Sequence, residues 1–121
     1  MLDKKTMVLG ASLNSTRYSF LAINKLRQHG HTVVAVGLKE GYVGDVPITK
    51  NKVEEKNIDT VTLYMNPTNQ KAYYDYIFSL KPKRIIFNPG TENIELEEMA
   101  TAKGIETIEA CTLVLLSIGK Y

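Results

Sequence analysis

Short apolar, β-branched runs alternate with helix-like segments along this chain, and this alternation constrains the fold more than any other feature. Residues 6–11 form a short apolar run without the polar alternation of a half-exposed strand, which is typical of a strand buried on both faces. Further β-branched runs at 32–36, 60–64 and 84–87 predict three more strands. A fifth strand is predicted at 105–110. Strands separated by helices imply parallel pairing with right-handed crossovers. The sequence therefore predicts an α/β fold of three layers around a mainly parallel sheet of about five strands.

Helix signals fill the gaps between these strands. Asn66 and Pro67 are a typical N-cap and first helical residue, and Gly30 and Gly104 stand where helices commonly end. The predicted helices cover 19–29, 67–80, a segment that opens among Glu92 to Glu98 and closes at Gly104, and 112–119. Residues 38–57 show little apolar periodicity; a minor edge strand at 46–48 and one helical turn around 53–55 are predicted there.

Composition narrows the class of protein. The 121 residues carry a net charge of +2 and one cysteine, so we expect a single domain over 1–121 without a disulfide. The charge is too small and too dispersed for general nucleic-acid binding. The longest apolar stretch near the end, 113–116, is far too short to span a membrane. One free thiol and no export signal favour the cytoplasm.

In open α/β sheets, ligands bind beyond the carboxyl ends of the strands, where the strand order reverses. The predicted ends are 10–14, 37–39, 65–67, 88–90 and Cys111. The first of these segments, 10–14, begins with small, flexible residues and precedes a helix N-terminus. Its backbone amides can therefore approach a phosphate closely. Arg17 could grip that phosphate, although a plain βα turn with a solvated arginine is as good an interpretation.

The same loop matches the dinucleotide fingerprint poorly. Gly10 is present, but Ser12 and Ser15 stand where the other two glycines belong. The fingerprint also expects an acidic residue after the second strand to hold the ribose, and Lys39 lies there instead. A cation at that position favours a phosphorylated ribose, unless Lys39 is a solvated loop charge.

These residues resemble a known family, the small bacterial CoA-binding proteins related to the CoA-binding domain of the succinyl-CoA synthetase α subunit. The resemblance covers nearly the whole chain. It is carried by 8–12 with Arg17-Tyr18-Ser19, by 30–36, by 41–47 and by the step at 64–67. The chain departs from the family at Gly37-Leu38, where Asn-Pro is usual, and at 109–112, where Asp-Arg-Cys-Pro is usual.

The resemblance implies a Rossmann-like domain that binds CoA or acyl-CoA, with the diphosphate at the first loop. It implies no catalysis of the synthetase kind, because the phosphorylated histidine of those enzymes lies in a second domain. No metal site is predicted. The predicted cofactor-binding residues are Gly10, Ala11, Ser12, Asn14, Arg17, Tyr18, Ser19, Gly37, Leu38, Lys39, Met65, Asn66, Pro67, Asn88, Pro89 and Gly90.

For the other side chains that could bind a metal or react, a structural role is the better interpretation. His29 and His31 flank a glycine at a helix end, which favours capping over metal binding. Cys111 is predicted to be a small buried residue, although its position after a strand would let it reach the crevice. The tyrosines of 73–76 have helical spacing and are predicted to pack. The carboxylates of 95–98 are predicted to be dipole partners on a solvated face.

Three hypotheses share this fold. The first is a non-catalytic CoA-binding or sensor module. The second is an NAD(P)-binding oxidoreductase-like domain, which lacks two glycines, the acidic residue after the second strand and a substrate domain. The third is an interaction domain with a vestigial pocket, which would associate with a second copy or an unknown protein through 113–116 or the tyrosine-rich helix.

Overall fold

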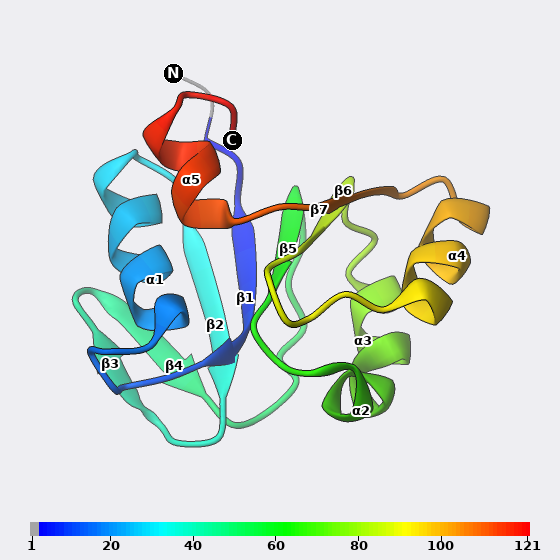
Figure 1. Cartoon of the computed structure of the whole chain (residues 1–121). Helices are drawn as coiled ribbons and strands as arrows, with labels where there is room; N and C mark the ends of the chain where they lie inside the picture. Colours follow the sequence, from blue (N-terminus) through cyan, green and yellow to red (C-terminus); the bar gives the residue numbers. More distant parts are fainter. Residues whose placement is uncertain (1–2) are drawn as a thin grey trace.

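The computed structural model describes residues 3–121, and a twisted sheet runs through the middle of the molecule (Figure 1). Its seven strands follow the order β3-β4-β2-β1-β5-β6-β7, and all neighbours are parallel except β3 and β4. The predicted α/β class is thereby confirmed, with seven strands instead of about five. The strands are β1 (Thr6–Ala11), β2 (Val33–Gly37), β3 (Gly41–Val43), β4 (Val46–Thr49), β5 (Thr60–Leu63), β6 (Arg84–Phe87) and β7 (Glu106–Glu109).

Helices cover both faces of the sheet. Figure 1 shows α1 and α5 side by side over β1 and β2, and α2, α3 and α4 gathered beyond β5. Within residues 3–121, no helix is long and apolar enough to cross a membrane. The helices are α1 (Tyr18–Gln28), α2 (Pro67–Gln70), the 3₁₀ turn η1 (Lys71–Tyr73), α3 (Tyr74–Ser79), α4 (Ile94–Ala102) and α5 (Thr112–Ser117).

The segment between β2 and β5 differs most from the prediction. The strand expected at 46–48 forms as β4, but β3 pairs with it and takes the edge position. The helical turn expected around 53–55 is wrong, because tertiary contacts hold this segment without helix. The Val53 carbonyl accepts a 2.6 Å hydrogen bond from the Tyr76 hydroxyl, and Glu55 forms a 2.8 Å ion pair with Lys5.

The helix predicted at 67–80 is also broken. The chain follows α2, η1 and α3 in succession instead of one continuous helix. The Ala72 carbonyl accepts a 2.6 Å hydrogen bond from the Lys52 ammonium, which competes with the backbone ladder of a helix at this point. Tyr73 has φ −110° and ψ −1°, away from ideal helical values.

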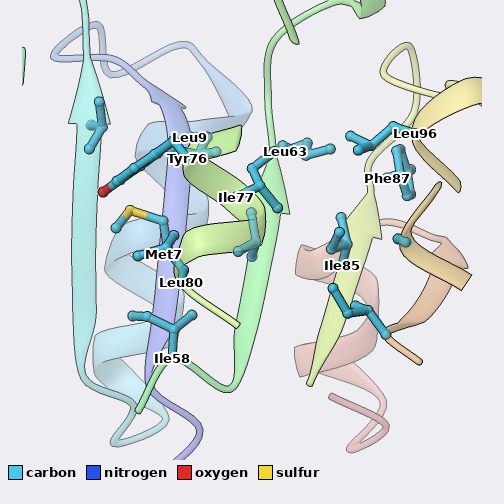
Figure 2. Close-up of a cluster of buried hydrophobic side chains, with 14 residues drawn as sticks. Met7, Leu9, Ile58, Leu63, Tyr76, Ile77, Leu80, Ile85, Phe87 and Leu96 are labelled. Carbon is cyan, nitrogen blue, oxygen red and sulfur yellow. The ribbon is translucent and has the colours of Figure 1, made fainter. Parts of the chain in front are cut away.

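Each face of the sheet has its own apolar cluster. Met7, Leu9 and Leu63 point from β1 and β5 toward Ile77 and Leu80 beyond the sheet (Figure 2). On the opposite face, β1, β2 and β4 pack against α1 and α5. β1 contributes to both clusters, which explains why its sequence is apolar without alternation. On the opposite face the cluster consists of Val8, Ala11, Ile23, Leu26, Val33, Ala35, Val43, Val46, Ile48 and Leu116.

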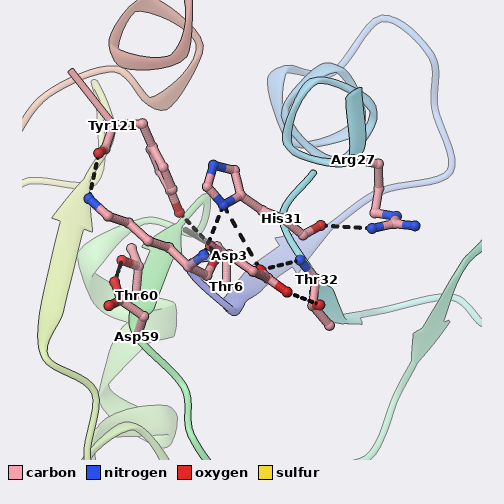
Figure 3. A network of polar contacts seen from close by, with 9 residues as sticks. Asp3, Thr6, Arg27, His31, Thr32, Asp59, Thr60 and Tyr121 are labelled. Atoms are coloured by element: carbon pink, nitrogen blue, oxygen red, sulfur yellow. Dashed lines mark hydrogen bonds and ion pairs between the residues drawn. The ribbon is translucent and has the colours of Figure 1, made fainter. Parts of the chain in front are cut away.

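A polar network closes the amino ends of β1 and β2 (Figure 3). The imidazole Nδ1 of buried His31 accepts a 2.9 Å hydrogen bond from the Lys4 amide, and its ring lies 5.0 Å from that of Tyr121. Burial lowers the pKa of His31. Hydrogen bonds from Thr32 lower the pKa of Asp3. The ligand sites of such sheets lie at the other end of the strands, so this network stabilises the fold.

Candidate functional site

The strand order reverses between β1 and β5, and this point defines the candidate site. From β1 the chain continues to β2 and β4 on one side of β1, then returns to β5 on its other side. The two following segments therefore diverge to opposite faces of the sheet, and in open α/β sheets ligands bind in the crevice between such segments. The crevice has the loop after β1 on one side and 64–67 on the other.

Gly10 shapes the floor of this crevice. Its φ is +91°, a conformation that side chains rarely adopt. A Cβ built on Gly10 would lie 2.8 Å from the carbonyl carbon of Tyr64. The register between β1 and β2 also shifts between Leu9 and Ala11. Glycine at position 10 therefore allows two backbone segments to approach closely at the point where a ligand would cross the sheet.

Gly37 plays a similar part at the end of β2. A Cβ there would lie 2.2 Å from the carbonyl oxygen of Ala11, so the ends of β1 and β2 can meet only without a side chain. Leu38 and Lys39 then turn into solvent, and Leu38 is 89% exposed. The departure from the family at Gly37-Leu38 thus coincides with a close contact between the ends of the first two strands.

The loop that joins β1 to α1 is held by short hydrogen bonds. Ser12 Oγ accepts from the Asn14 amide at 3.0 Å, and Asn14 Oδ1 accepts from the Thr16 amide at 3.0 Å and its hydroxyl at 2.7 Å. The leucine between them, Leu13, packs against Gly41 of β3. These contacts fix the loop before any ligand arrives.

The N-terminus of α1 carries no cap of its own. Arg17 holds the N-cap position without a side-chain hydrogen bond to the first turn, and that turn has no acidic residue. Its amides are therefore available to an anion. Arg17 and Tyr18 are exposed beside them, whereas Ser19 is buried and faces the core.

The loop after β5 is fixed equally well. Asn66 caps α2, since its side chain accepts a 2.9 Å hydrogen bond from the Asn69 amide. Gln70, fully buried, donates 2.9 and 2.8 Å hydrogen bonds to the carbonyls of Met65 and Thr91, and accepts one of 2.8 Å from Asn93. This network ties the loops after β5 and β6 together.

Asn88 differs from the other predicted site residues. Its amide nitrogen donates hydrogen bonds of 2.7 Å to Thr62 Oγ1 and 2.9 Å to the Leu63 carbonyl, and its oxygen accepts from the Thr112 amide at 2.9 Å. The side chain is buried and engaged by the scaffold. Pro89 and Gly90 are exposed beside it, one strand further from the reversal point.

Sequence reasoning missed two polar residues near this edge. Gln70 is buried on the same side of the helical segment as Tyr73 and Ile77, which follow it by three and seven residues. A polar residue at a position of the apolar face could have indicated its structural role. The Tyr64 hydroxyl is buried without a hydrogen-bond partner within residues 3–121, and burial raises its pKa. The strand pattern gives no sign that the Tyr64 hydroxyl is buried, although Tyr64 belongs to the step at 64–67 that carries the family resemblance.

Other features lie outside the crevice. Cys111 is half-buried at the N-cap of α5, and His29 is the C-cap residue of α1. No group of three or more metal-ligating side chains occurs in the described part of the chain. A hollow of about 600 Å³ lies at the amino edge, near Lys5 and Leu80. Another of about 570 Å³ lies between α4 and β7.

Known proteins were compared with the chain as a whole. A family model described as a CoA binding domain matches residues 4–117. The crystal structure of an uncharacterized protein is 50% identical, with a TM-score of 0.96 over 100% of both chains. A hypothetical protein from Pyrococcus horikoshii is 23% identical, with a TM-score of 0.82 over 93% of this chain and 80% of its own. A Thermus thermophilus protein is 18% identical, with a TM-score of 0.83 over 98% and 91%. The curated proteins include no match.

Proposed function

Since the chain belongs to the family of CoA-binding domains, related to that of the succinyl-CoA synthetase α subunit, we propose that it binds CoA or acyl-CoA at the carboxyl edge between β2, β1 and β5. The observation that carries this proposal is the pairing of Gly10 with the uncapped start of α1. Gly10 brings backbone close to the crossing point, and the first amides of α1 are free. Together they make a cradle for a diphosphate.

In this proposal, two cationic side chains bind different phosphate groups of the ligand. Arg17, at the start of α1, binds the diphosphate through its planar fork. Lys39, two residues beyond β2, binds the 3′-phosphate that distinguishes CoA from simpler adenine nucleotides. Both side chains are exposed, so they are accessible to a ligand that lies across the edge.

The proposed role is that of a non-catalytic binding or sensor module in the cytoplasm. The residues around the crevice are mainly glycine, small polar and basic residues, with no histidine or carboxylate among those predicted to contact the ligand. Such a set suits an anion and lacks the histidine and carboxylates that most often act as general acid or base. The hydrogen-bonded loops at 12–17 and 65–70 support binding without rearrangement.

Calorimetry with three ligands tests the proposal. CoA and dephospho-CoA should bind, and NAD should not. Lys39→Ala should weaken CoA by at least about tenfold and dephospho-CoA little, because only CoA carries the lost partner. Arg17→Ala should weaken both equally. Lys83→Ala, an exposed lysine just before β6 at the amino edge, is the matched control and should change neither.

The outcomes separate the three hypotheses. Equal binding of NAD and CoA would favour the oxidoreductase-like domain, and no binding of either would favour an interaction domain with a vestigial pocket. An unchanged ratio of CoA to dephospho-CoA affinity in Lys39→Ala would show that Lys39 does not read the 3′-phosphate.

A further inference from the structure

The edge of the sheet formed by β7 is the most unusual surface outside the proposed ligand site. β7 is the last strand in the sheet order, so no strand of residues 3–121 pairs with its outer side. The amide of Glu106 donates a 3.0 Å hydrogen bond to the carbonyl of Lys83, just before β6, and that of Ala110 a 3.1 Å bond to the carbonyl of Phe87 in β6. Alternate residues of a strand point their backbone groups to opposite edges. Thr107 and Glu109 therefore present their amides and carbonyls outward.

A hollow adjoins this free edge. It has a volume of about 570 Å³ and is lined by residues of α4 and β7. Ile94, which is 72% exposed, and Ala102 form its apolar part. The side chains of Thr107 and Glu109 open into it from the strand. An extended segment that paired with β7 would thus find room for its alternate side chains on the side of α4.

The hollow is acidic, and its carboxylates form no ion pair within residues 3–121. Glu97, Glu98 and Glu109 line it, without a lysine or arginine. None of the three forms an ion pair in the described residues. Glu97 Oε2 is buried without a hydrogen-bond partner in the part of the chain that the structure describes, and burial and the nearby Glu109 carboxylate raise the pKa of Glu97. The solvated acidic face predicted for 95–98 is therefore partly enclosed.

Single charges on an edge strand commonly prevent aggregation. That function would not require Glu97 and Glu109 to be placed against each other, which is unfavourable in the isolated chain. A cationic neighbour would remove this repulsion. A second copy of the chain is a poor occupant, because symmetric pairing of two β7 edges would bring two acidic hollows together.

We propose that the β7 edge and the hollow beside α4 bind an extended basic segment of a partner protein, which adds a strand to the sheet and places alternate lysine or arginine side chains against Glu97, Glu98 and Glu109. The backbone of Thr107 and Glu109 provides the pairing, and the carboxylates select basic side chains. This surface is separate from the crevice at β1 and β5, so it is independent of the proposed CoA binding.

A short synthetic peptide tests the proposal on the intact chain. The probe is a fluorescent seven-residue peptide of alternating lysine and threonine, followed by anisotropy and by backbone NMR of the protein. Binding should shift the amide signals of Thr107 and Glu109 and weaken as salt is added. The double variant Glu97→Gln/Glu109→Gln should bind roughly tenfold less tightly. Glu54→Gln, an exposed glutamate of the β4–β5 connection, is the matched control and should bind normally.

Two further peptides separate strand addition from simple charge attraction. The same peptide with every backbone nitrogen methylated keeps its charge but has no amide to donate along either edge, and should lose binding. A glutamate–threonine peptide should not bind. The proposal is overturned if the methylated peptide binds as well as the parent, if the double variant binds normally, or if millimolar lysine peptide leaves the β7 amides unchanged. It is also overturned if these amides shift with protein concentration alone, which would indicate a second copy.

Discussion

At the scale of the residue, Gly10 is the position where a single substitution should affect both the fold and the candidate site most directly. We expect Gly10→Ala to lower the free energy of unfolding by at least about 2 kcal/mol, because the methyl group adds a clash to a strained φ. The predicted clash is with the Tyr64 backbone, 2.8 Å away. Urea unfolding measures the loss, and calorimetry should show weaker CoA binding by the folded variant.

Gly104→Ala is the matched control for this experiment. Gly104 has φ +78°, but a Cβ there would meet nothing within 4 Å. Gly104→Ala should therefore lower the free energy of unfolding through backbone strain alone, by about 1 kcal/mol. Equal losses in the two variants would mean that the close approach to Tyr64 adds no constraint at Gly10.

His31 should make stability depend on pH. Its pKa in the folded chain lies below the unfolded value of 6.5, mainly because of burial. The unfolded chain therefore binds more protons below that value, and the stabilising contribution of neutral His31, present above pH 6.5, is lost as the pH falls. His31→Asn retains an acceptor for the Lys4 amide without a titrating ring. Between pH 7.5 and 5.5, urea unfolding should show a smaller loss of unfolding free energy for the variant than for the parent chain. An equal loss in both would assign the pH effect to other groups.

Individual residues also show where sequence reasoning ends. Gly10 could be found because a glycine near the end of a buried strand has a specific conformational meaning. Gln70 and Asn88 act through partners distant in the chain, such as Thr91 and Thr112, and no local pattern encodes those contacts. The close approach of Gly37 to Ala11 is likewise set by the pairing of β1 and β2.

At the scale of the element, the two asparagine caps Asn66 and Asn93 should contribute different amounts to the free energy of unfolding. Asn66→Ala should cost about 1 kcal/mol, because it removes an exposed cap from α2. Asn93→Ala should cost about 2 to 3 kcal/mol, because it uncaps α4 and leaves the buried Gln70 Oε1 without its donor. Thermal or urea unfolding of both variants decides this; a similar loss in the two would show that the Gln70 network adds little.

Element prediction succeeded where a segment repeats one pattern over several residues. The strands β1 and β6 and the helix α1 were predicted within one residue of their ends, because burial on both faces and helical spacing leave clear patterns. The three-residue strand β3 is too short to carry a period. Around Val53 and at Tyr73, contacts with Tyr76 and Lys52 decide the local structure, and those contacts exist only in the folded chain.

At the scale of the whole molecule, the sheet should make the chain unfold as one unit. The two apolar clusters lie on opposite faces, but both contain residues of β1, such as Met7 and Val8. Neither cluster can dissolve without disrupting that strand. We therefore expect far-UV circular dichroism and tyrosine fluorescence to give one coincident urea transition, as a single domain requires.

One substitution in each cluster makes this prediction specific. Leu96→Ala opens a cavity beneath α4, and Leu116→Ala opens one beneath α5. Each should cost about 2 to 5 kcal/mol, and in each variant both probes should move to the same lower midpoint. The expectation follows from β1 and β5 lying at the centre of the sheet, so damage on either face reaches the strands that hold the candidate crevice. Separate midpoints for the two probes in Leu116→Ala would show that α1 and α5 unfold independently, and CoA should then stabilise only the transition that includes Gly10.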